Sequence, residues 1–415
     1  MDPRNPDHLV RFTDTPAGNV KASTPTHPVY GERVSAQREW GLYIHLPWCV
    51  RKCPYCDFNS HRAPEHLPER RYVDALCREM EVAAPGLRAR RLVSIFLGGG
   101  TPSLFSPEAI ERLLKTARVS FPIAPDTEIT LEANPGTAEA ERFMGYRDAG
   151  VNRLSLGVQS FNDDRLLALG RIHSAEQARA AIQMARDAQF DAINIDLMYG
   201  LPGQTLAEAR DDLEEALDLE PEHLSYYQLT LEEGTPFFHS PPRCPDEPVL
   251  AGIEADAASL FAATGYKRYE VSAYAKGGRY ACRHNLGYWQ YGDYLGIGAG
   301  AHSKLRHADG VWRQVRTRVP TRYLAAIEDG HSAYEERRLE MGEIRFEFFL
   351  NALRLREGFA PDLYQAQVGE SLDAVAKTLR ELADLGLLAI SDHNVRATSR
   401  GYAMLDEVVG SFLPP

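Results

Sequence analysis

The apolar residues of this chain follow two alternating patterns from about residue 39 onward. Six short runs are rich in β-forming residues, and they lie at 41–46, 92–100, 127–135, 152–159, 191–200 and 223–230. Segments between them, such as SPEAIERLLKTARVS (106–120) and TLAEARDDLEEALDL (205–219), repeat apolar residues at helical spacing. Strands alternating with helices of this length predict right-handed βαβ units and a parallel sheet.

Six such units are too few to close the usual eight-stranded α/β barrel. We therefore predict an α/β fold whose core, residues 39–280, is a partial, open (β/α)6 TIM-like barrel, with a doubly wound sheet as the alternative. Residues 1–38 contain five prolines and no sustained period, which predicts an extended or disordered leader. Residues 281–338 are interpreted as a connecting region.

Residues 339–415 differ in kind from the core. Two helical segments, a hairpin around Asp392-His393-Asn394 and a last helix predict a small winged-helix-like α+β module. Such modules often bind DNA. Residues 341–415 hold 11 acidic and 7 basic side chains, a net charge of -4 (7 - 11), which argues against a phosphate-contacting surface. We expect a lid or a protein-docking role instead.

Charge and hydropathy narrow the setting of the whole chain. The sequence carries 46 Lys+Arg against 58 Asp+Glu, a net charge of -12, and no basic run, so nucleic acid is not an expected partner. No apolar stretch approaches the roughly 18 residues of a membrane span. The six cysteines, three of them clustered, differ from a secreted disulfide framework and are typical of metal binding in a reducing compartment. We expect a cytoplasmic protein.

Polar and glycine-rich motifs follow five successive predicted strands. They are the cysteine loop WCVRKCPYC (48–56), GGGTP (98–102), EANP (132–135), GVQS (157–160) with Arg171 shortly after, and DLMYG (196–200). In parallel α/β folds the chemistry lies at the carboxyl ends of the strands. Each motif alone has an ordinary explanation as a turn or a helix cap, but five at equivalent strand ends predict a functional rim.

Cys49, Cys53 and Cys56 have the spacing C-x3-C-x2-C. Three thiolates hold three corners of a 4Fe-4S cluster and leave the fourth iron without a protein ligand. An open position on a metal is where a substrate or cofactor binds. The alternative is a zinc site completed by a distant residue, with His45 and His61 as candidates, but structural zinc usually shows paired two-ligand knuckles.

This cysteine motif, with Tyr55 before its last thiol, resembles the signature of the radical S-adenosylmethionine (SAM) superfamily. In that superfamily the amino and carboxylate groups of SAM chelate the open iron, and one-electron reduction yields a 5′-deoxyadenosyl radical. YIHLPWC (43–49), GGGTPS, LEANP, GVQSF and NIDLMYGLPGQT resemble, more narrowly, the subfamily of oxygen-independent coproporphyrinogen III oxidases and HemW-type haem chaperones. The resemblance runs from about residue 41 to the C-terminus, and it implies a 4Fe-4S cluster, SAM and an electron donor for the cluster.

The resemblance also implies which residues contact SAM, namely Tyr43, Gly99, Gly100, Thr101, Glu132, Gln159, Arg171, Asp196 and Thr230. The tyrosine would lie beside the cluster, and the glycines would let the backbone approach the amino acid end of SAM. Glu132 would accept from the ammonium or a ribose hydroxyl, and Arg171 would pair with the carboxylate. Gln159 and Asp196 would bond the ribose region, and Thr230 would contact the adenosine.

Two places separate the oxidases from the chaperones. The oxidases resemble C-x3-C-x2-C-x-C, and here Phe58 occupies the position of the further cysteine, as in the chaperone branch. Residues 284–289, HNLGYW, match the HNxxYW motif of that branch, whose histidine is associated with haem binding. Imidazole is a common haem ligand, so the resemblance assigns haem binding to His284. The alternative interpretation is that His284 and Asn285 cap a turn while Tyr288 and Trp289 fill the core.

Two hypotheses about function follow. The favoured one is a haem chaperone that binds a 4Fe-4S cluster, SAM and haem and passes haem to an acceptor, such as a respiratory haem protein, with no catalytic residue assigned. The other is a radical SAM oxidase that decarboxylates the propionates of coproporphyrinogen III. Cys282 would matter if haem attaches covalently, but we interpret it, with Cys77 and Cys244, as a buried, inert thiol.

Overall fold

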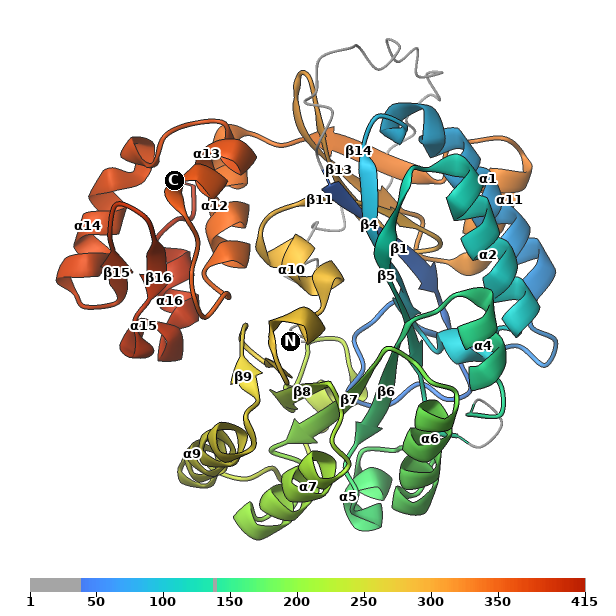
Figure 1. Cartoon of the computed structure of the whole chain (residues 1–415), viewed down its shortest axis with the longest axis horizontal. Helices are drawn as coiled ribbons and strands as arrows, with labels where there is room; N and C mark the ends of the chain where they lie inside the picture. The colour runs from blue at the N-terminus through green and yellow to red at the C-terminus, as the bar shows by residue number, and fades with distance from the viewer. Residues whose placement is uncertain (1–38, 137–139, 415) are drawn as a thin grey trace.

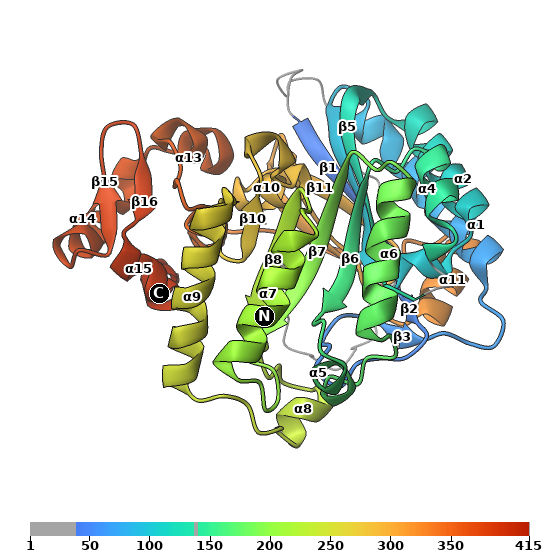
Figure 2. The same ribbon diagram turned by 60° about the horizontal axis from the view of Figure 1, so that its bottom comes forward.

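The computed structural model describes residues 39–136 and 140–414, so the leader predicted for residues 1–38 lies outside the described residues. Within that part of the chain the central element is a twelve-stranded sheet with the order β14-β13-β12-β11-β1-β4-β5-β6-β7-β8-β10-β9. Its six middle strands are β1 (Glu39–Leu46), β4 (Arg91–Gly99), β5 (Ile123–Ala133), β6 (Arg153–Gln159), β7 (Ala192–Tyr199) and β8 (His223–Gln228). Figures 1 and 2 show the helices packed outside this sheet.

The six middle strands are the six that the sequence predicts, and every neighbouring pair among them is parallel. They lie side by side in chain order. A doubly wound sheet reverses its strand order at a switch point, whereas these six strands keep one direction, which argues against that alternative. The α/β fold is confirmed, and the closure of these strands into a partial barrel stays a prediction.

The sheet continues beyond the six middle strands at both ends. The outer strands are β9 (Lys267–Arg268), β10 (Ala273–Ala275), β11 (Asp293–Ile297), β12 (His302–His307), β13 (Gly310–Arg316) and β14 (Tyr334–Arg338). β11 pairs with β1 in parallel, and β12 to β14 add antiparallel strands. Residues 281–338, which the sequence interprets as a connection, thus contribute four strands to the same sheet as the core.

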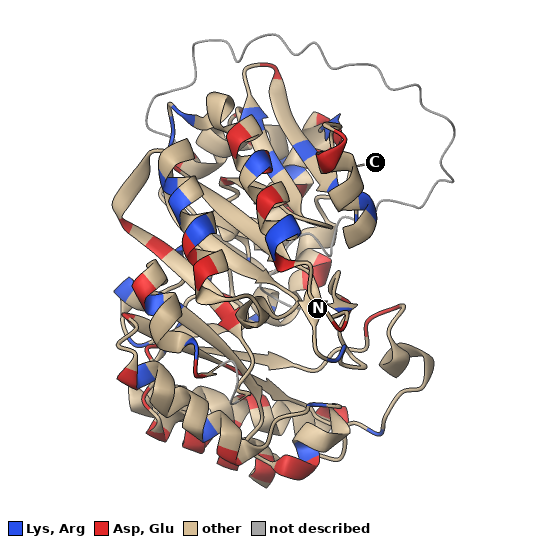
Figure 3. Cartoon of the chain, turned by 90° about the vertical axis from the view of Figure 1, so that its right-hand side faces the viewer, with Lys and Arg blue, Asp and Glu red and all other residues tan. Residues whose placement is uncertain are grey.

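Helix starts in the core follow local capping rules. Ser106 accepts a hydrogen bond from the backbone of Ala109, and capping boxes at Ser174 and Thr205 satisfy two orphan amides each. The helices that these caps begin are α2 (Pro107–Ser120), α6 (Ala175–Asp187) and α7 (Leu206–Asp218). Acidic and basic residues are interspersed along the helices in Figure 3, as expected for solvated faces.

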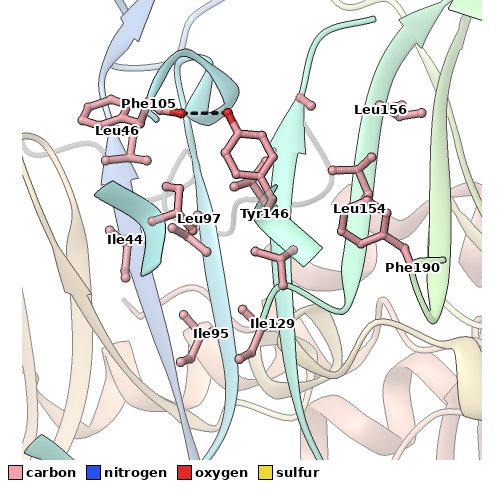
Figure 4. Close-up of a cluster of buried hydrophobic side chains, with 14 of the residues drawn as sticks. Ile44, Leu46, Ile95, Leu97, Phe105, Ile129, Tyr146, Leu154, Leu156 and Phe190 are labelled. Carbon is pink, nitrogen blue, oxygen red and sulfur yellow. Dashed lines mark hydrogen bonds between the residues drawn. The ribbon is translucent and has the colours of Figure 1, made fainter. Parts of the chain in front are cut away.

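The two faces of the central strands differ in character. Leu42, Ile44 and Leu46 of β1 are fully buried in the main apolar cluster, and Figure 4 shows Ile44 and Leu46 there. In that cluster the Tyr146 hydroxyl donates to the backbone oxygen of Phe105 at 2.7 Å. Burying large apolar side chains contributes roughly 1.5–3 kcal/mol each. The opposite, inner face carries the alternate residues of each strand, and many of them are polar.

The C-terminal module has its own apolar core and lies beside the sheet (Figure 1). Its elements are α12 (Met341–Ala352), α13 (Pro361–Val368), α14 (Ala376–Asp384), β15 (Leu388–Ile390), β16 (Val395–Ala397), α15 (Ser399–Ala403) and α16 (Leu405–Gly410). The hairpin is as predicted. The prediction of two helices before it was wrong, because α13, whose eight residues give a weak apolar pattern, was missed. The predicted last helix is divided at Met404.

No helix in the described residues combines the length and the apolar character that crossing a bilayer requires.

Candidate functional site

A pocket of about 970 Å³, including its open mouth, lies at the carboxyl ends of the central strands. Its lining includes the three clustered cysteines and eight of the nine residues predicted to contact SAM: Gly99, Gly100, Thr101, Glu132, Gln159, Arg171, Asp196 and Thr230. The structure therefore brings these residues together from the ends of six different strands and the loops that follow them. Tyr43 is the one predicted SAM residue outside the lining.

The cysteine loop forms one wall of this pocket. Cys49, Cys53 and Cys56 are half-buried free thiols. Burial raises the pKa of the Cys56 thiol to about 11, partly offset by the hydroxyl of Ser60, and burial also raises the pKa of Cys49. Each free thiol with a raised pKa keeps its proton at neutral pH, and iron must replace that proton when it binds sulfur. Each thiol of a 4Fe-4S site binds a different iron, so the three need not converge on one point.

A zinc site has less support. In residues 39–136 and 140–414, no three His, Cys, Asp or Glu side chains gather as ligands of one metal ion. Both ring nitrogens of His45 are already bonded, Nδ1 to the Tyr43 hydroxyl at 3.0 Å and Nε2 to the Asn59 oxygen at 3.0 Å. The side chain of His45 thus stabilises the segment after the cysteines through its hydrogen bond with the Asn59 backbone oxygen.

Arg171 is a half-buried cation in the pocket lining. Its Nη2 donates to Asn134 Oδ1 and to the Gly157 oxygen, both at 2.7 Å, and its Nη1 lies 3.6 Å from Cys53 Sγ. The remaining nitrogen, Nε, is buried and has no hydrogen-bond partner. A half-buried guanidinium with a spare donor beside the cysteine loop fits a carboxylate ligand at the cluster.

Asp196 and Gln159 line the pocket from β7 and the end of β6. Asp196 Oδ1 accepts from the Asn194 amide at 2.8 Å. Gln159 has a φ of 71°, which is rare for a residue with a side chain, and its Oε1 accepts from the Tyr227 hydroxyl at 2.9 Å. Such a backbone persists where surrounding structure enforces it, commonly at functional sites.

Gly99 and Gly100 are required by packing. Gly99 has a φ of +110°, and a Cβ there would lie 2.3 Å from His45 Cε1. A Cβ on Gly100 would lie 2.6 Å from the Trp48 backbone oxygen. The two glycines therefore let this loop close against the cysteine loop, a reason that the sequence pattern did not reveal. Their approach to the amino acid end of SAM stays a prediction.

Sequence reasoning missed the lining residue Tyr227, and it assigned no contact to Tyr55, Asn134 and Met198, although they lie in its motifs. Asn134 belongs to a motif that the sequence singles out, and its bond to Arg171 gives it a structural role. Tyr227 lies on the inner face of β8. Both residues lie at the end of a strand, and this position could have indicated from the sequence that they line the site.

His284 lies outside the pocket lining, on α10 (Arg283–Trp289). Its ring is buried, with Nδ1 3.1 Å from Ser94 Oγ and Nε2 3.1 Å from the Tyr288 hydroxyl. Burial lowers the pKa of His284 to about 3, so the imidazole is neutral, as a metal ligand must be. Both nitrogens are engaged, and binding iron requires one of these hydrogen bonds to break. The centroid of the Tyr43 ring lies 6.2 Å from that of the His284 ring.

Cys282 precedes α10 and is buried. Its thiol donates to Glu128 Oε1 at 3.3 Å, and burial raises the pKa of this thiol to about 12. A protonated, enclosed thiol is a poor nucleophile, which supports its interpretation as an inert residue.

Family models agree with this arrangement. Residues 43–216 match the Radical SAM superfamily, and residues 342–404 match the HemN C-terminal domain. The proteins named heme chaperone HemW from Haemophilus influenzae and Escherichia coli K12 are 45% and 44% identical to this chain, each over 90% of the chain and 97% of the relative. That from Bacillus subtilis is 36% identical over 89% of the chain and 98% of its own length.

The chain belongs to the HemW family of radical SAM proteins.

Among solved structures, the E. coli coproporphyrinogen III oxidase HemN, a radical SAM enzyme, superposes with a TM-score of 0.75 over 91% of both chains. Its sequence is 23% identical, so the likeness shows a shared fold. In the HemW family member described here, Phe58 lies in the pocket wall at the position where the oxidase pattern expects a fourth cysteine.

Proposed function

We propose that this protein is a haem chaperone that holds a 4Fe-4S cluster and SAM in the pocket, binds haem, and transfers it to an acceptor protein. The observation that carries the proposal is the similarity to proteins named heme chaperone HemW along nearly their whole length. The acceptor, for example a respiratory haem protein, and the electron donor for the cluster are partners that the proposal requires. We place this function in the cytoplasm.

The residues of the pocket suit these ligands. Cys49, Cys53 and Cys56 would hold three irons, and the free Nε of Arg171 would receive the carboxylate of SAM. When bound, the cluster supplies one electron at a time and an open iron. Asp196 and Glu132 offer acceptors for hydroxyl or ammonium groups, and the buried walls limit the access of water.

His284 is the proposed haem ligand. The ring is neutral but bonded to Ser94 and Tyr288, so haem must replace one of these partners. A spectral haem titration of His284→Ala against wild type tests this. His302→Ala, which alters a partly buried histidine on β12, is the matched control. Equal affinity of His284→Ala and wild type for haem would show that the ligand assignment is wrong.

The second candidate is oxidative decarboxylation of coproporphyrinogen III, favoured by the HemN-like fold. Phe58 argues against it. The purified protein, reconstituted with iron and sulfide under anaerobic conditions, would be given SAM, a reductant and coproporphyrinogen III. The chaperone proposal expects no steady formation of protoporphyrinogen, and sustained turnover would refute it.

We propose that the three segments defined from the sequence have different functions. We assign cluster and SAM binding to residues 39–280, haem binding to residues 281–338 and protein docking or a lid to residues 339–415. Arg313 on β13 and Glu347 on α12 form a buried ion pair at 2.8 Å, which ties the last two segments together. Deleting the C-terminal module would expose this arginine, so docking is better tested by surface substitutions on the wing hairpin.

A further inference from the structure

A chain of hydrogen bonds crosses the inner face of the sheet from the pocket wall to the start of α10. Asp196 Oδ1, in the wall, accepts from Asn194 Nδ2 at 2.8 Å. Asn194 Oδ1 lies 2.6 Å from His223 Nδ1, and His223 Nε2 lies 2.9 Å from the Tyr269 hydroxyl. That hydroxyl accepts from the backbone N–H of Cys282 at 3.2 Å.

The donors of this chain all point toward Asp196. The carboxylate of Asp196 requires a donor, which turns the amide nitrogen of Asn194 toward it and the amide oxygen toward His223. An amide oxygen only accepts, so we assign the proton of His223 to Nδ1 and make Nε2 the acceptor of the Tyr269 hydroxyl. The hydroxyl oxygen then accepts from Cys282. Successive dipoles that end on a charge strengthen one another.

The middle residues of this hydrogen-bond chain are buried from solvent. Asn194 is 3% exposed and His223 is 1% exposed. The Ser225 hydroxyl also donates to Asn194 Oδ1, at 3.2 Å, which holds the amide in the same orientation. Water therefore has little access to replace a weakened bond, and a change at one end is felt at the other.

The far end of the chain controls how α10 begins. Cys282 is the N-cap of α10 and gives no side-chain cap. Its N–H is held by Tyr269, while its thiol and the N–H of His284 both donate to Glu128 Oε1, at 3.3 and 3.1 Å. The Tyr269 backbone oxygen in turn accepts from Arg356 of the C-terminal module at 3.0 Å. Tyr269 thus forms hydrogen bonds with His223 of the hydrogen-bond chain, with the N-cap of α10 and with the C-terminal module.

We propose that His223 and Tyr269 are positioning residues that couple occupancy of the pocket to the first turn of α10. A ligand whose hydroxyls donate to Asp196 shares the negative charge that polarises the chain. The bond from Cys282 to Tyr269 then weakens, and the turn that carries His284 opens more readily. The identity of the two coupled ligands, SAM and haem, rests on the proposed function. Linkage is reciprocal, so haem at α10 would change SAM affinity by the same factor.

Amide hydrogen exchange measures the coupling between the pocket and α10 in the absence of haem. Amide exchange of peptides spanning residues 280–289 would be measured on the full chain, anaerobically reconstituted, with and without SAM, and SAM binding would be quantified by equilibrium dialysis. We expect SAM to speed wild-type exchange there on the order of fivefold, the lower end of typical coupling. Tyr269→Phe should exchange fast with and without SAM. His223→Phe breaks the chain at its middle and should do the same.

Tyr266→Phe is the matched control, because it removes a buried hydroxyl that bonds Pro221 outside the chain. It should keep the wild-type response to SAM. The coupling is overturned if wild type binds SAM with unchanged exchange at 280–289, or if Tyr269→Phe and His223→Phe respond as wild type does. A wild type that shows the SAM response but takes up no haem refutes the chaperone function and leaves the coupling standing. A wild type that binds no SAM overturns both.

Discussion

Replacing Arg171 by lysine separates charge from geometry in the pocket. Arg171 is half-buried, and two of its bonds, each 2.7 Å long, fix the guanidinium plane against Asn134 and Gly157. Its Nε is buried and has no hydrogen-bond partner, which leaves one donor for a ligand that reaches it. A lysine ammonium keeps the positive charge but is a single point without the planar fork. Arg171→Lys therefore loses at least one charge-assisted hydrogen bond in the complex with SAM.

The expected magnitude follows from that lost bond. A hydrogen bond to a charged group contributes about 1.5–3 kcal/mol, which corresponds to roughly 10- to 140-fold in Kd. We expect the Kd of SAM, measured by anaerobic equilibrium dialysis, to rise within this range. Because Arg171 Nη1 lies 3.6 Å from Cys53 Sγ, iron and sulfide contents must be matched before affinities are compared.

Arg147→Lys, which changes an arginine on the outer surface, is the control and should bind SAM as wild type does. If Arg171→Lys, with a full cluster, binds SAM within twofold of wild type, the guanidinium does not receive the ligand. The assignment of the carboxylate to Arg171 would then be wrong.

Three further substitutions test the framework around the site. Burial raises the pKa of Asp212 from 3.8 to about 6, although hydrogen bonds from Ser160 and Phe161 lower it in part. The folded state therefore favours the protonated carboxyl, and the stability gained from that protonation is present below pH 4 and lost as the pH rises through 6. Relative to Asp212→Asn, the wild-type free energy of unfolding should fall by about 3 kcal/mol between pH 4 and 7 in urea titrations, and a flat difference would contradict this. Gly100→Ala should lower iron incorporation and cost roughly 1–3 kcal/mol or more, because its Cβ meets the Trp48 backbone; normal iron content and melting temperature would contradict the packing argument. Phe349→Ala, which removes a ring stacked 3.7 Å from Phe412, should destabilise the C-terminal module by about 3–5 kcal/mol in the same titrations while SAM affinity stays at the wild-type value; a loss of SAM affinity would show that the module and the pocket fold as one unit.

The middle of the sheet was predictable because one face of each strand packs under helices. Leu42, Ile44 and Leu46 alternate with polar or aromatic residues, which gives a strand pattern that no helix shares. Strands β11 to β14 gave weaker signals. β12 and β13 carry buried charges such as Lys304 and Arg313, whose partners, Asp293 and Glu347, are distant in sequence. A local pattern cannot show that such charges are paired and buried, so these strands were missed.

The candidate site was predictable to the extent that strand ends and motifs coincide. Arg171 was assigned from the resemblance, but its second role, bracing Asn134 and Gly157, depends on a fold that brings three loops together. The reason for Gly99 and Gly100 was likewise hidden, since His45 and Trp48 lie some 50 residues away in sequence. The sequence indicated which residue types belong to the site, whereas the residues that contact them are seen only in the folded structure.

His284 shows how a motif and a structure constrain each other. The motif predicts a haem ligand, and the alternative predicts a turn cap and core residues. Tyr288 and Trp289 are buried, as the alternative expects, but Cys282 is the N-cap of α10, and both nitrogens of His284 bond to side chains. The two interpretations are compatible if α10 opens to bind haem. Opening costs at least the hydrogen bond to Tyr288, about 0.5–1.5 kcal/mol, and the bonds of Cys282 and His284 to Tyr269 and Glu128 must yield as well. A chaperone must release its cargo, and a site that closes on itself when empty supplies part of the free energy for that release.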